Sequence, residues 1–263
     1  MKDTPKGKTA LITGATGGFG SRLASIHASR GGNLVLVGRN EAKLSSLREK
    51  LSGSGTEIRT FTADLKDEDS AEKIHDFTLR EGIEVDYLIN DAGFGGGGSF
   101  SERPMAGDLD EIAVNVVALT KLMKLFLPDF IKRGSGRIMN VASQAALVPG
   151  PGQAVYFATK AFVDSLSNAV WEEVRHLPGD VSVTSVLPGP METGFIAAAS
   201  AEKMPLFRHS LSPEKPALKA YEAMLKGRLR VCVALKWWQK PVMALLPIYP
   251  RRLVLRVVWL LQR

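Results

Sequence analysis

The sequence predicts a single α/β domain built around a doubly wound parallel sheet. Short apolar runs of strand length alternate with longer amphipathic stretches along most of the 263-residue chain. This is the pattern of parallel strands that are covered by helices on both faces. A glycine-rich turn follows the first apolar run, and ligands bind such sheets at the carboxyl ends of their strands. The sequence therefore also predicts where the functional site lies.

Six buried strands and the helices between them can be placed along the chain. We expect strands over 9–13, 34–37, 58–63, 85–90, 136–141 and 181–187. The expected helices cover 21–30, 41–52, a long stretch interrupted at Pro128, and the segment from Tyr156 to about Arg175. Neither an internal repeat nor a linker marks a second domain. We assign 1–222 to the catalytic part, including a mobile and mostly apolar lid over 194–213, and 223–263 to a basic extension of the same domain.

The net charge of +7 is concentrated near the C-terminus. Residues 223–263 carry nine basic and no acidic side chains, whereas the other 222 residues carry 25 basic and 27 acidic ones. A nucleic-acid-binding domain would place its basic patch on the folded core, so this distribution argues against one. The single cysteine, Cys232, fits a reducing compartment. The N-terminus lacks an apolar signal-peptide core and no run of about 18 apolar residues exists, so we expect a cytoplasmic protein. We also expect no metal site.

The turn Thr13-Gly14-Ala15-Thr16-Gly17-Gly18-Phe19-Gly20 is a candidate dinucleotide site. Glycines let the backbone approach a pyrophosphate without obstruction by a Cβ atom. The amides at the N-terminus of the following helix would then face the phosphates. The spacing differs from the commoner Gly-x-Gly-x-x-Gly fingerprint, and a purely structural turn is the alternative. The position between a buried strand and a helix favours the dinucleotide.

The end of the second strand indicates which dinucleotide is bound. Enzymes that bind the unphosphorylated cofactor usually place a carboxylate there for the ribose hydroxyl. This chain has Gly38-Arg39-Asn40 instead. A guanidinium can pair with a 2′-phosphate, although Arg39 could also be a solvated loop residue. We therefore expect NADP(H) to be preferred over NAD(H). Asp64-Leu65, after the third strand, suits the adenine edge, and the aspartate is also a good helix cap.

Tyr156 and Lys160 are candidate catalytic residues. Residues four apart on a helix share a face, and Ser143 lies thirteen positions upstream of the tyrosine. A nearby ammonium lowers the pKa of a phenol, which would make Tyr156 a usable general acid or base near neutral pH. Tyr-x-x-x-Lys alone is a weak signal. Its combination with the glycine turn, Ser143 and Asn115 is much more specific.

Together these residues resemble the short-chain dehydrogenase/reductase family, a Rossmann-type fold, over roughly residues 7–195. The remaining motifs of the resemblance are Asn90-Asp91-Ala92-Gly93, Asn115 and Pro188-Gly189. The resemblance implies that Tyr156 exchanges a proton with the substrate oxygen, that Ser143 bonds the same oxygen, and that Lys160 also binds the nicotinamide ribose. It further implies that Asn115 holds a water in a proton relay. The segment 188–193, with Met191 and Thr193, would close over the nicotinamide.

One position departs from the family pattern. The motif after the fourth strand usually reads Asn-Asn-Ala-Gly, and here Asp91 replaces the second asparagine. Asn90, Ala92 and Gly93 are retained, so cofactor placement should survive. The extra carboxylate would either weaken binding slightly near the ribose or pair with a nearby base.

The resulting function is an NADP(H)-dependent reductase or dehydrogenase acting on a carbonyl or secondary alcohol. The alternative is a catalytically silent, cofactor-bound scaffold or regulator of the same fold. The apolar lid favours a hydrophobic or amphiphilic substrate, through the side chains Phe195, Ile196, Met204, Leu206 and Phe207. By analogy with the family, a homo-oligomer would form through the helices carrying Asn115 and Tyr156, with an outer face of Phe157, Phe162, Leu166 and Trp171.

The C-terminal segment from Arg251 to Arg263 is predicted to be an amphipathic helix. At about 100° per residue, Arg252, Arg256 and Arg263 share one side, and apolar residues cover the remaining surface. So wide an apolar arc must pack on the catalytic body, on another subunit or into a membrane interface. A lobe docked beside the substrate is one interpretation. Peripheral attachment to an anionic membrane is the other, because arginines opposite tryptophan and leucine are typical of interfacial helices.

Overall fold

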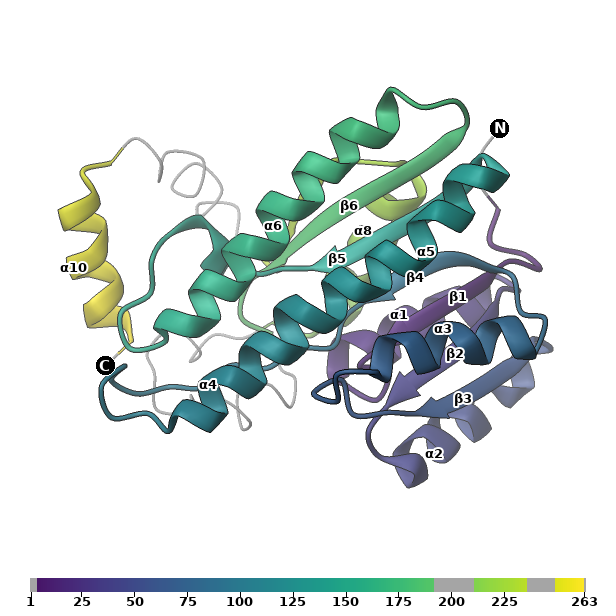
Figure 1. The fold of residues 1–263 in the computed structure, drawn as a ribbon, viewed down its shortest axis with the longest axis horizontal. Coiled ribbons are helices and arrows are strands. Elements are labelled where there is room, and N and C mark those ends of the chain that lie inside the picture. Colours follow the sequence, from purple (N-terminus) through teal and green to yellow (C-terminus); the bar gives the residue numbers. More distant parts are fainter. Residues whose placement is uncertain (1–3, 192–210, 236–248, 263) are drawn as a thin grey trace.

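The fold is a seven-stranded parallel sheet, seen in a computed structural model that describes residues 4–191, 211–235 and 249–262. The strands are β1 (Thr9–Thr13), β2 (Asn33–Gly38), β3 (Ile58–Thr62), β4 (Val85–Asn90), β5 (Ser135–Val141), β6 (Asp180–Pro188) and β7 (Arg230–Val233). Their order is β3-β2-β1-β4-β5-β6-β7. The chain thus runs outward from β1 to β3 and then returns to β4 on the other side of β1 (Figure 1). The doubly wound α/β prediction is confirmed.

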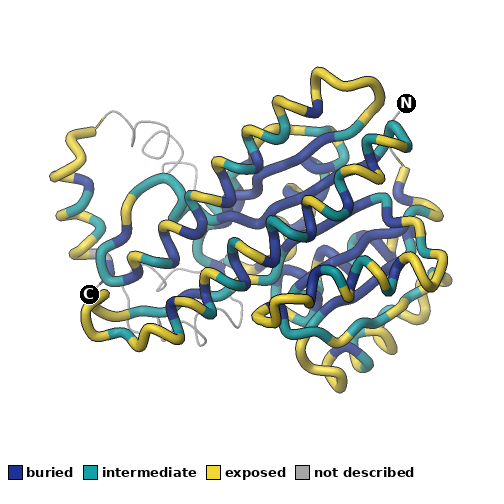
Figure 2. The backbone as a smooth tube through the Cα atoms, in the orientation of Figure 1, coloured by how far each residue is buried: buried dark blue, intermediate teal, exposed yellow. Residues whose placement is uncertain are grey.

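Helices cover both faces of the sheet. One face carries α1 (Gly18–Ser29), α2 (Glu41–Leu51) and α8 (Glu214–Leu225), and the other carries α3 (Ser70–Arg80), α5 (Leu119–Arg133) and α6 (Ala154–Arg175). Successive strand residues point to opposite faces of the sheet. Ile12 therefore packs in the core beneath α1 and α8, and Leu11 packs in the core beneath α3 and α5. Figure 2 shows the central strands β1, β2, β4, β5 and β6 as mostly buried, whereas the edge strand β3 has no buried residue. Shorter elements are a 3-10 turn at Ser52–Ser54, another at Gln144–Leu147, and α4 (Met105–Ile112).

A buried histidine joins α1, α8 and the start of β1. The Nδ1 atom of His27 lies 2.6 Å from the Tyr221 hydroxyl, and its Nε2 atom lies 3.0 Å from the carbonyl oxygen of Lys8. Nε2 must donate to that carbonyl oxygen, which can only accept. The lowered pKa keeps the ring neutral, so Nδ1 accepts from the tyrosine hydroxyl. Burial lowers the pKa of His27 to about 4, against the raising effect of the backbone hydrogen bonds.

The expected interruption at Pro128 is wrong, because α5 continues through this residue to Arg133. A proline inside a helix costs about 3 kcal/mol relative to alanine. Here its neighbours on the inner face, Phe126 and Phe130, are buried in the core. Full burial of a phenylalanine contributes roughly 1.5–3 kcal/mol, so packing offsets the lost helical hydrogen bond.

The tail contributes a strand that the sequence analysis did not anticipate. β7 pairs with β6, with Cys232 opposite Leu187, and places Val231 and Val233 in the core. Arg230 anchors it through a 2.6 Å contact with the carboxylate of Asp164 on α6. The segment 223–263 therefore includes part of the sheet as well as the expected helix, α10 (Arg251–Leu261). In the part of the chain described, no helix is long and apolar enough to cross a membrane.

Candidate active site

A cavity of about 840 Å³ lies at the carboxyl ends of the strands. It gathers most residues predicted for cofactor binding and catalysis. These are Gly14, Thr16, Gly18, Phe19, Arg39, Asp64, Leu65, Ala92, Gly93, Ser143, Tyr156, Lys160, Pro188, Gly189 and Met191. Thr13, Gly20, Asn90 and Asn115 are buried behind this lining. Thr193 and the lid residues up to 210 lie outside the described residues.

The glycine turn fits tightly against the end of β4. Gly14 has a φ of +65°, and a Cβ atom there would lie 2.8 Å from the backbone of Ala92. A Cβ atom on Gly20 would lie 2.5 Å from the Gly14 carbonyl oxygen. The hydroxyl of Thr13 accepts a hydrogen bond of 3.2 Å from the Ala92 amide. This arrangement leaves the N-terminus of α1, at Gly18, on the cavity wall, where its free amides suit a pyrophosphate.

Asn90 supports the site from behind the lining. Its Nδ2 atom donates to Asn140 Oδ1 at 2.9 Å, and Asn140 donates in turn to the Ser167 hydroxyl at 2.9 Å. This buried chain connects β4, β5 and α6. Its effect is to fix the positions of the strand end that carries Gly93 and of the helix that carries Tyr156.

The part of the cavity that is lined by the end of β2 and the start of α2 is basic. Arg39 and Lys43 both line it and both are exposed. Asp64 lies nearby, but one of its carboxylate oxygens accepts from the Lys66 amide at 3.1 Å, as in a capped turn. Sequence reasoning missed Lys43, although a signal was present. Asn40 caps α2 by accepting from the Lys43 amide at 2.9 Å, and a cap at position 40 places residue 43 in the first turn.

The catalytic candidates lie together on the first turns of α6. Tyr156 and Lys160 are both buried, and the lysine Nζ lies 5.9 Å from the tyrosine ring centroid. Nζ donates a 2.8 Å hydrogen bond to the carbonyl oxygen of Val141, at the end of β5. Ser143 follows that strand two residues later and reaches the same cavity.

The predicted direction of the Tyr156 pKa shift is wrong. Burial raises the pKa of Tyr156 to about 12, while hydrogen bonding to Ser143 lowers it and the charge of Glu111 raises it. Burial also lowers the pKa of Lys160 to about 8, against the raising effects of Asp91 and Glu111. Desolvation of the phenolate therefore sets the direction of the shift, and the Lys160 ammonium is not among the groups that change the pKa of Tyr156. Tyr156 is held in its acid form.

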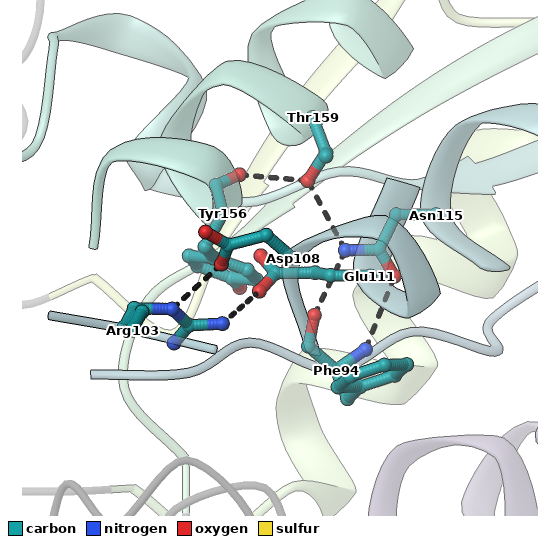
Figure 3. Close-up of polar contacts among 7 residues, drawn as sticks. All are labelled: Phe94, Arg103, Asp108, Glu111, Asn115, Tyr156 and Thr159. Carbon is teal, nitrogen blue, oxygen red and sulfur yellow. Dashed lines mark hydrogen bonds and ion pairs between the residues drawn. The ribbon is translucent and has the colours of Figure 1, made fainter. Parts of the chain in front are cut away.

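Asn115 occupies a π-helical turn, Ala113–Ala118, between α4 and α5. Its side-chain amide makes two hydrogen bonds to the backbone of Phe94 (Figure 3). Oδ1 accepts from the N–H at 3.1 Å, and Nδ2 donates to the C=O at 2.8 Å. Nδ2 also donates to the Thr159 hydroxyl at 3.1 Å. π-turns are rare and often occur at functional sites. The water relay implied by the resemblance stays a prediction; the observed role of Asn115 is to join the loop after β4 to α6.

Asp91 lies against the glycine turn. Its Oδ2 atom would be 2.7 Å from a Cβ atom on Gly20. Burial raises the pKa of this carboxyl to about 7, and the Lys160 charge and the Gly20 amide lower it. We expected Asp91 either to weaken cofactor binding or to pair with a nearby base. Its electrostatic interaction with Lys160 favours the second.

The C-terminal helix forms a wall of the same cavity, which is where the interpretation as a docked substrate lobe places it. Its contribution consists of Tyr249, Leu253, Val254, Val257, Val258 and Gln262. Val148, Gln153 and Phe157 line the same cavity. Phe157 is therefore a buried cavity residue, and its expected place on an outer oligomer face is wrong. Phe162 is exposed, as that prediction required.

The doubly wound sheet, the glycine turn and the Ser–Tyr–Lys set at one cavity are the features expected of a dinucleotide-dependent oxidoreductase. Residues 8–204 match the family profile described as short chain dehydrogenase. The chain belongs to this family, and the resemblance stated above is confirmed.

Relatives and solved structures agree with this assignment. An uncharacterised oxidoreductase of Bacillus subtilis, YvrD, is 34% identical over 73% of this chain and 72% of its own length. The rat very-long-chain 3-oxoacyl-CoA reductase is 35% identical over 69% of this chain, a match that spans 59% of the rat protein. A short-chain dehydrogenase from Sphingobium yanoikuyae in complex with NADPH superposes with a TM-score of 0.79 and 30% identity, covering 92% of this chain and 96% of that one.

Two further proteins similar to this chain differ from those above in their bound cofactor or in their named activity. A short-chain dehydrogenase from Burkholderia phymatum in complex with NAD has a TM-score of 0.82 and 25% identity over 93% of each chain. A fatty acyl-CoA reductase of Acinetobacter baylyi is 29% identical over 89% of this chain and 79% of its own length. Structures similar to this chain thus bind NAD as well as NADPH.

Proposed function

We propose that this chain is an NADP(H)-dependent oxidoreductase that acts on the carbonyl or secondary alcohol of a hydrophobic or amphiphilic substrate. The observation that supports this most is the convergence of Ser143, Tyr156 and Lys160 on the cavity that also holds the glycine turn and Arg39. A scaffold that had lost catalysis would have no need to keep these side chains at an open cavity.

The chemistry divides between the cofactor and the chain. When bound, the nicotinamide supplies or accepts the hydride. The Ser143 hydroxyl and the Tyr156 phenol donate hydrogen bonds to the substrate oxygen and polarise the carbonyl, and Tyr156 transfers its proton to that oxygen during reduction. A pKa of about 12 keeps this phenol protonated at neutral pH, which favours carbonyl reduction. Lys160, fixed by the Val141 carbonyl, places its ammonium beside the phenol.

NADPH oxidation against a panel of ketones and aldehydes tests the proposal. Tyr156→Phe removes the transferable proton and should lower turnover by two or more orders of magnitude, with cofactor affinity nearly unchanged. Tyr221→Phe is the matched control, because it removes a buried hydroxyl that bonds His27 and should affect stability rather than turnover. Near-normal turnover of Tyr156→Phe would refute the catalytic assignment. Cofactor binding without turnover of any carbonyl would favour the scaffold.

NADP(H) preference is supported by the end of β2. Arg39 and the adjacent Lys43 present two cations to the cavity, and no carboxylate follows the strand directly. A 2′-phosphate would find two charge-assisted partners there, whereas a free 2′-hydroxyl would lack its usual acceptor.

The substrate class is supported by the cavity walls. Val148, Phe157, Val254 and Val258 give an apolar lining next to the catalytic residues. The rat and Acinetobacter relatives are named as reductases of 3-oxoacyl-CoA and fatty acyl-CoA, which are carbonyl compounds with long apolar chains. We expect kcat/KM to rise with the apolar length of the carbonyl substrate. A flat profile over a homologous series would contradict this.

Two glutamines add a polar requirement. Gln153 is 2% and Gln262 is 8% exposed, and both line the cavity. The Nε2 atom of Gln153 and the Oε1 atom of Gln262 are buried without a hydrogen-bond partner among the described residues. Unpaired buried amide atoms are costly, so a substrate hydroxyl or secondary amide, which both donates and accepts, would satisfy them. Gln262→Leu should lower kcat/KM about tenfold for a hydroxylated ketone and spare its deoxy analogue. An equal loss for both ketones would contradict this.

The position of α10 supports a docked substrate lobe over the membrane alternative. Val254 is buried and lines the cavity, yet Leu260 on the same helix is 70% exposed and does not line it. Packing thus accounts for part of the apolar arc only, and the exposed part is still compatible with an anionic membrane. Co-sedimentation with anionic liposomes separates the two interpretations. Equal recovery of the intact chain and a variant truncated after Lys240 would end the membrane interpretation.

A further inference from the structure

Three charged side chains outside the predicted catalytic set form a buried cluster beside Tyr156. Arg103 donates from Nε to Asp108 at 2.6 Å and from a terminal nitrogen to Glu111 at 3.2 Å (Figure 3). The Glu111 side chain is fully buried, and those of Arg103 and Asp108 are each 13% exposed. A surface ion pair would need no such burial. Burying charged groups is costly unless they are paired, and here each carboxylate contacts the Arg103 guanidinium.

The loop after β4 connects this cluster to the catalytic tyrosine. Gly95 lies against the Tyr156 ring, where a Cβ atom would be 2.6 Å from Cδ2. Gly96 lies against the Arg103 guanidinium, where a Cβ atom would be 1.8 Å from Nη1. Only the backbone of these two consecutive glycines thus separates the Tyr156 ring from the Arg103 guanidinium. The α4 helix, which carries Glu111, also packs directly on α6.

We propose that Glu111 is a positioning residue for the proposed reaction, and that its buried carboxylate, held by Arg103, keeps Tyr156 and Lys160 protonated. The inference rests on the proposed function, because it concerns the groups that perform it. With all three groups ionised, the cluster carries one net negative charge. A negative charge favours the protonated form of any neighbour, so a phenol stays a phenol and an amine stays an ammonium.

The acidic groups near Tyr156 and Lys160 raise the pKa values of these two residues. From α6, Tyr156 and Lys160 each have a pKa that the Glu111 charge raises. Burial raises the pKa of Glu111 itself to about 7, with Arg103 lowering it, Asp108 raising it, and Gly96 and Lys160 lowering it slightly. Glu111 is therefore ionised above neutral pH, which is where Lys160 begins to lose its proton. From the loop after β4, Asp91 acts on Lys160 in the same direction and raises its pKa.

The test is the alkaline limb of the pH profile for carbonyl reduction, which Lys160 sets because its pKa of about 8 lies below that of Tyr156. In Glu111→Gln the limb should move to lower pH by about one unit, since a single nearby charge shifts a pKa by that order. The new amide can still accept from Arg103, so the cluster keeps its shape. Glu111→Asp keeps the charge and should restore the limb most of the way.

Asp108→Asn is the matched control. It removes the other carboxylate that bonds Arg103, but Asp108 is not among the charges that act on Tyr156 or Lys160. It should lower thermal stability while leaving the limb in place. A Glu111→Gln enzyme with reduced rates but an unmoved limb would overturn the inference and leave a structural role. That outcome differs from failure of the proposed function, in which wild type and Tyr156→Phe would be equally inactive or equally active.

Discussion

A single methyl group at Gly95 should separate the rigid interpretation of the loop after β4 from the flexible one that its glycines suggest. In Gly95→Ala the new Cβ atom would start 2.6 Å from Cδ2 and 2.8 Å from Cγ of Tyr156, whereas ordinary contact begins at 3.4 Å. The shortfall is 3.4 − 2.6 = 0.8 Å. The loop cannot easily yield, because Asn115 holds Phe94 at both its N–H and its C=O. The tyrosine ring must therefore move.

The expected loss follows from that displacement. A misplacement of about 1 Å in a catalytic group costs about 100-fold in rate, or about 2.7 kcal/mol of transition-state stabilisation. We expect kcat/KM of Gly95→Ala for its best carbonyl substrate to fall by about this factor. The dissociation constant of NADPH, measured by fluorescence titration, should change little, because the glycine turn at 14–20 is not touched.

Gly107→Ala supplies the control. This glycine lies in α4, and a Cβ atom added to it would meet nothing within 4 Å, so the same methyl group should be tolerated and should slightly stabilise the helix. A Gly95→Ala enzyme as active as Gly107→Ala would show that the loop moves aside freely, and the argument for a rigid Gly95–Tyr156 contact would fail.

Three further expectations concern other parts of the molecule. Arg39→Ala and Lys43→Ala should each weaken NADPH binding about tenfold relative to NADH, measured by competing titrations; a wild type that favours NADH would contradict the assignment of this strand end. Because the folded pKa of His27 is about 4 against 6.5 unfolded, its contribution is fully present above pH 6.5, and about 3 kcal/mol of unfolding free energy should be lost as pH falls to 4. His27→Asn should flatten that slope in urea titrations, and an unchanged slope would refute the neutral assignment. Light scattering should show an oligomer that Phe162→Glu weakens; a wild-type monomer at micromolar concentration would reject it.

The framework of the fold could be predicted because its signals are local. Most of the six expected strands are short apolar runs, and the glycine turn lies directly after the first of them, so sequence order alone places the site. β7 was missed because it has only four residues, Arg230–Val233, and two of them are polar or sulfur-containing. Its stability comes from the β6 partner and from Arg230 bonding Asp164, which are contacts between distant parts of the chain.

The same distinction applies to the site. Ser143, Tyr156 and Lys160 were found because their spacing is informative by itself. Glu111 was not, because an acidic residue in the run Asp108–Glu111 has the pattern of a solvated helix face. Only tertiary structure shows that Glu111 is fully buried, paired with Arg103 and hydrogen-bonded to the backbone of Gly96. The direction of the Tyr156 pKa shift was wrong for a related reason, since spacing shows a neighbouring charge but not the extent of burial.

Burial also explains why two carboxyl groups beside Lys160 matter. Desolvation alone would drive this lysine toward the neutral amine, and its pKa falls to about 8 even with Asp91 and Glu111 opposing the change. At pH 7 that value leaves about ten ammonium groups for each free amine. Loss of one carboxylate worth about one pKa unit would leave comparable amounts of the two forms. An asparagine at position 91, as in the usual family motif, would carry no charge, so Asp91 and Glu111 together give this chain a margin that neither residue provides alone.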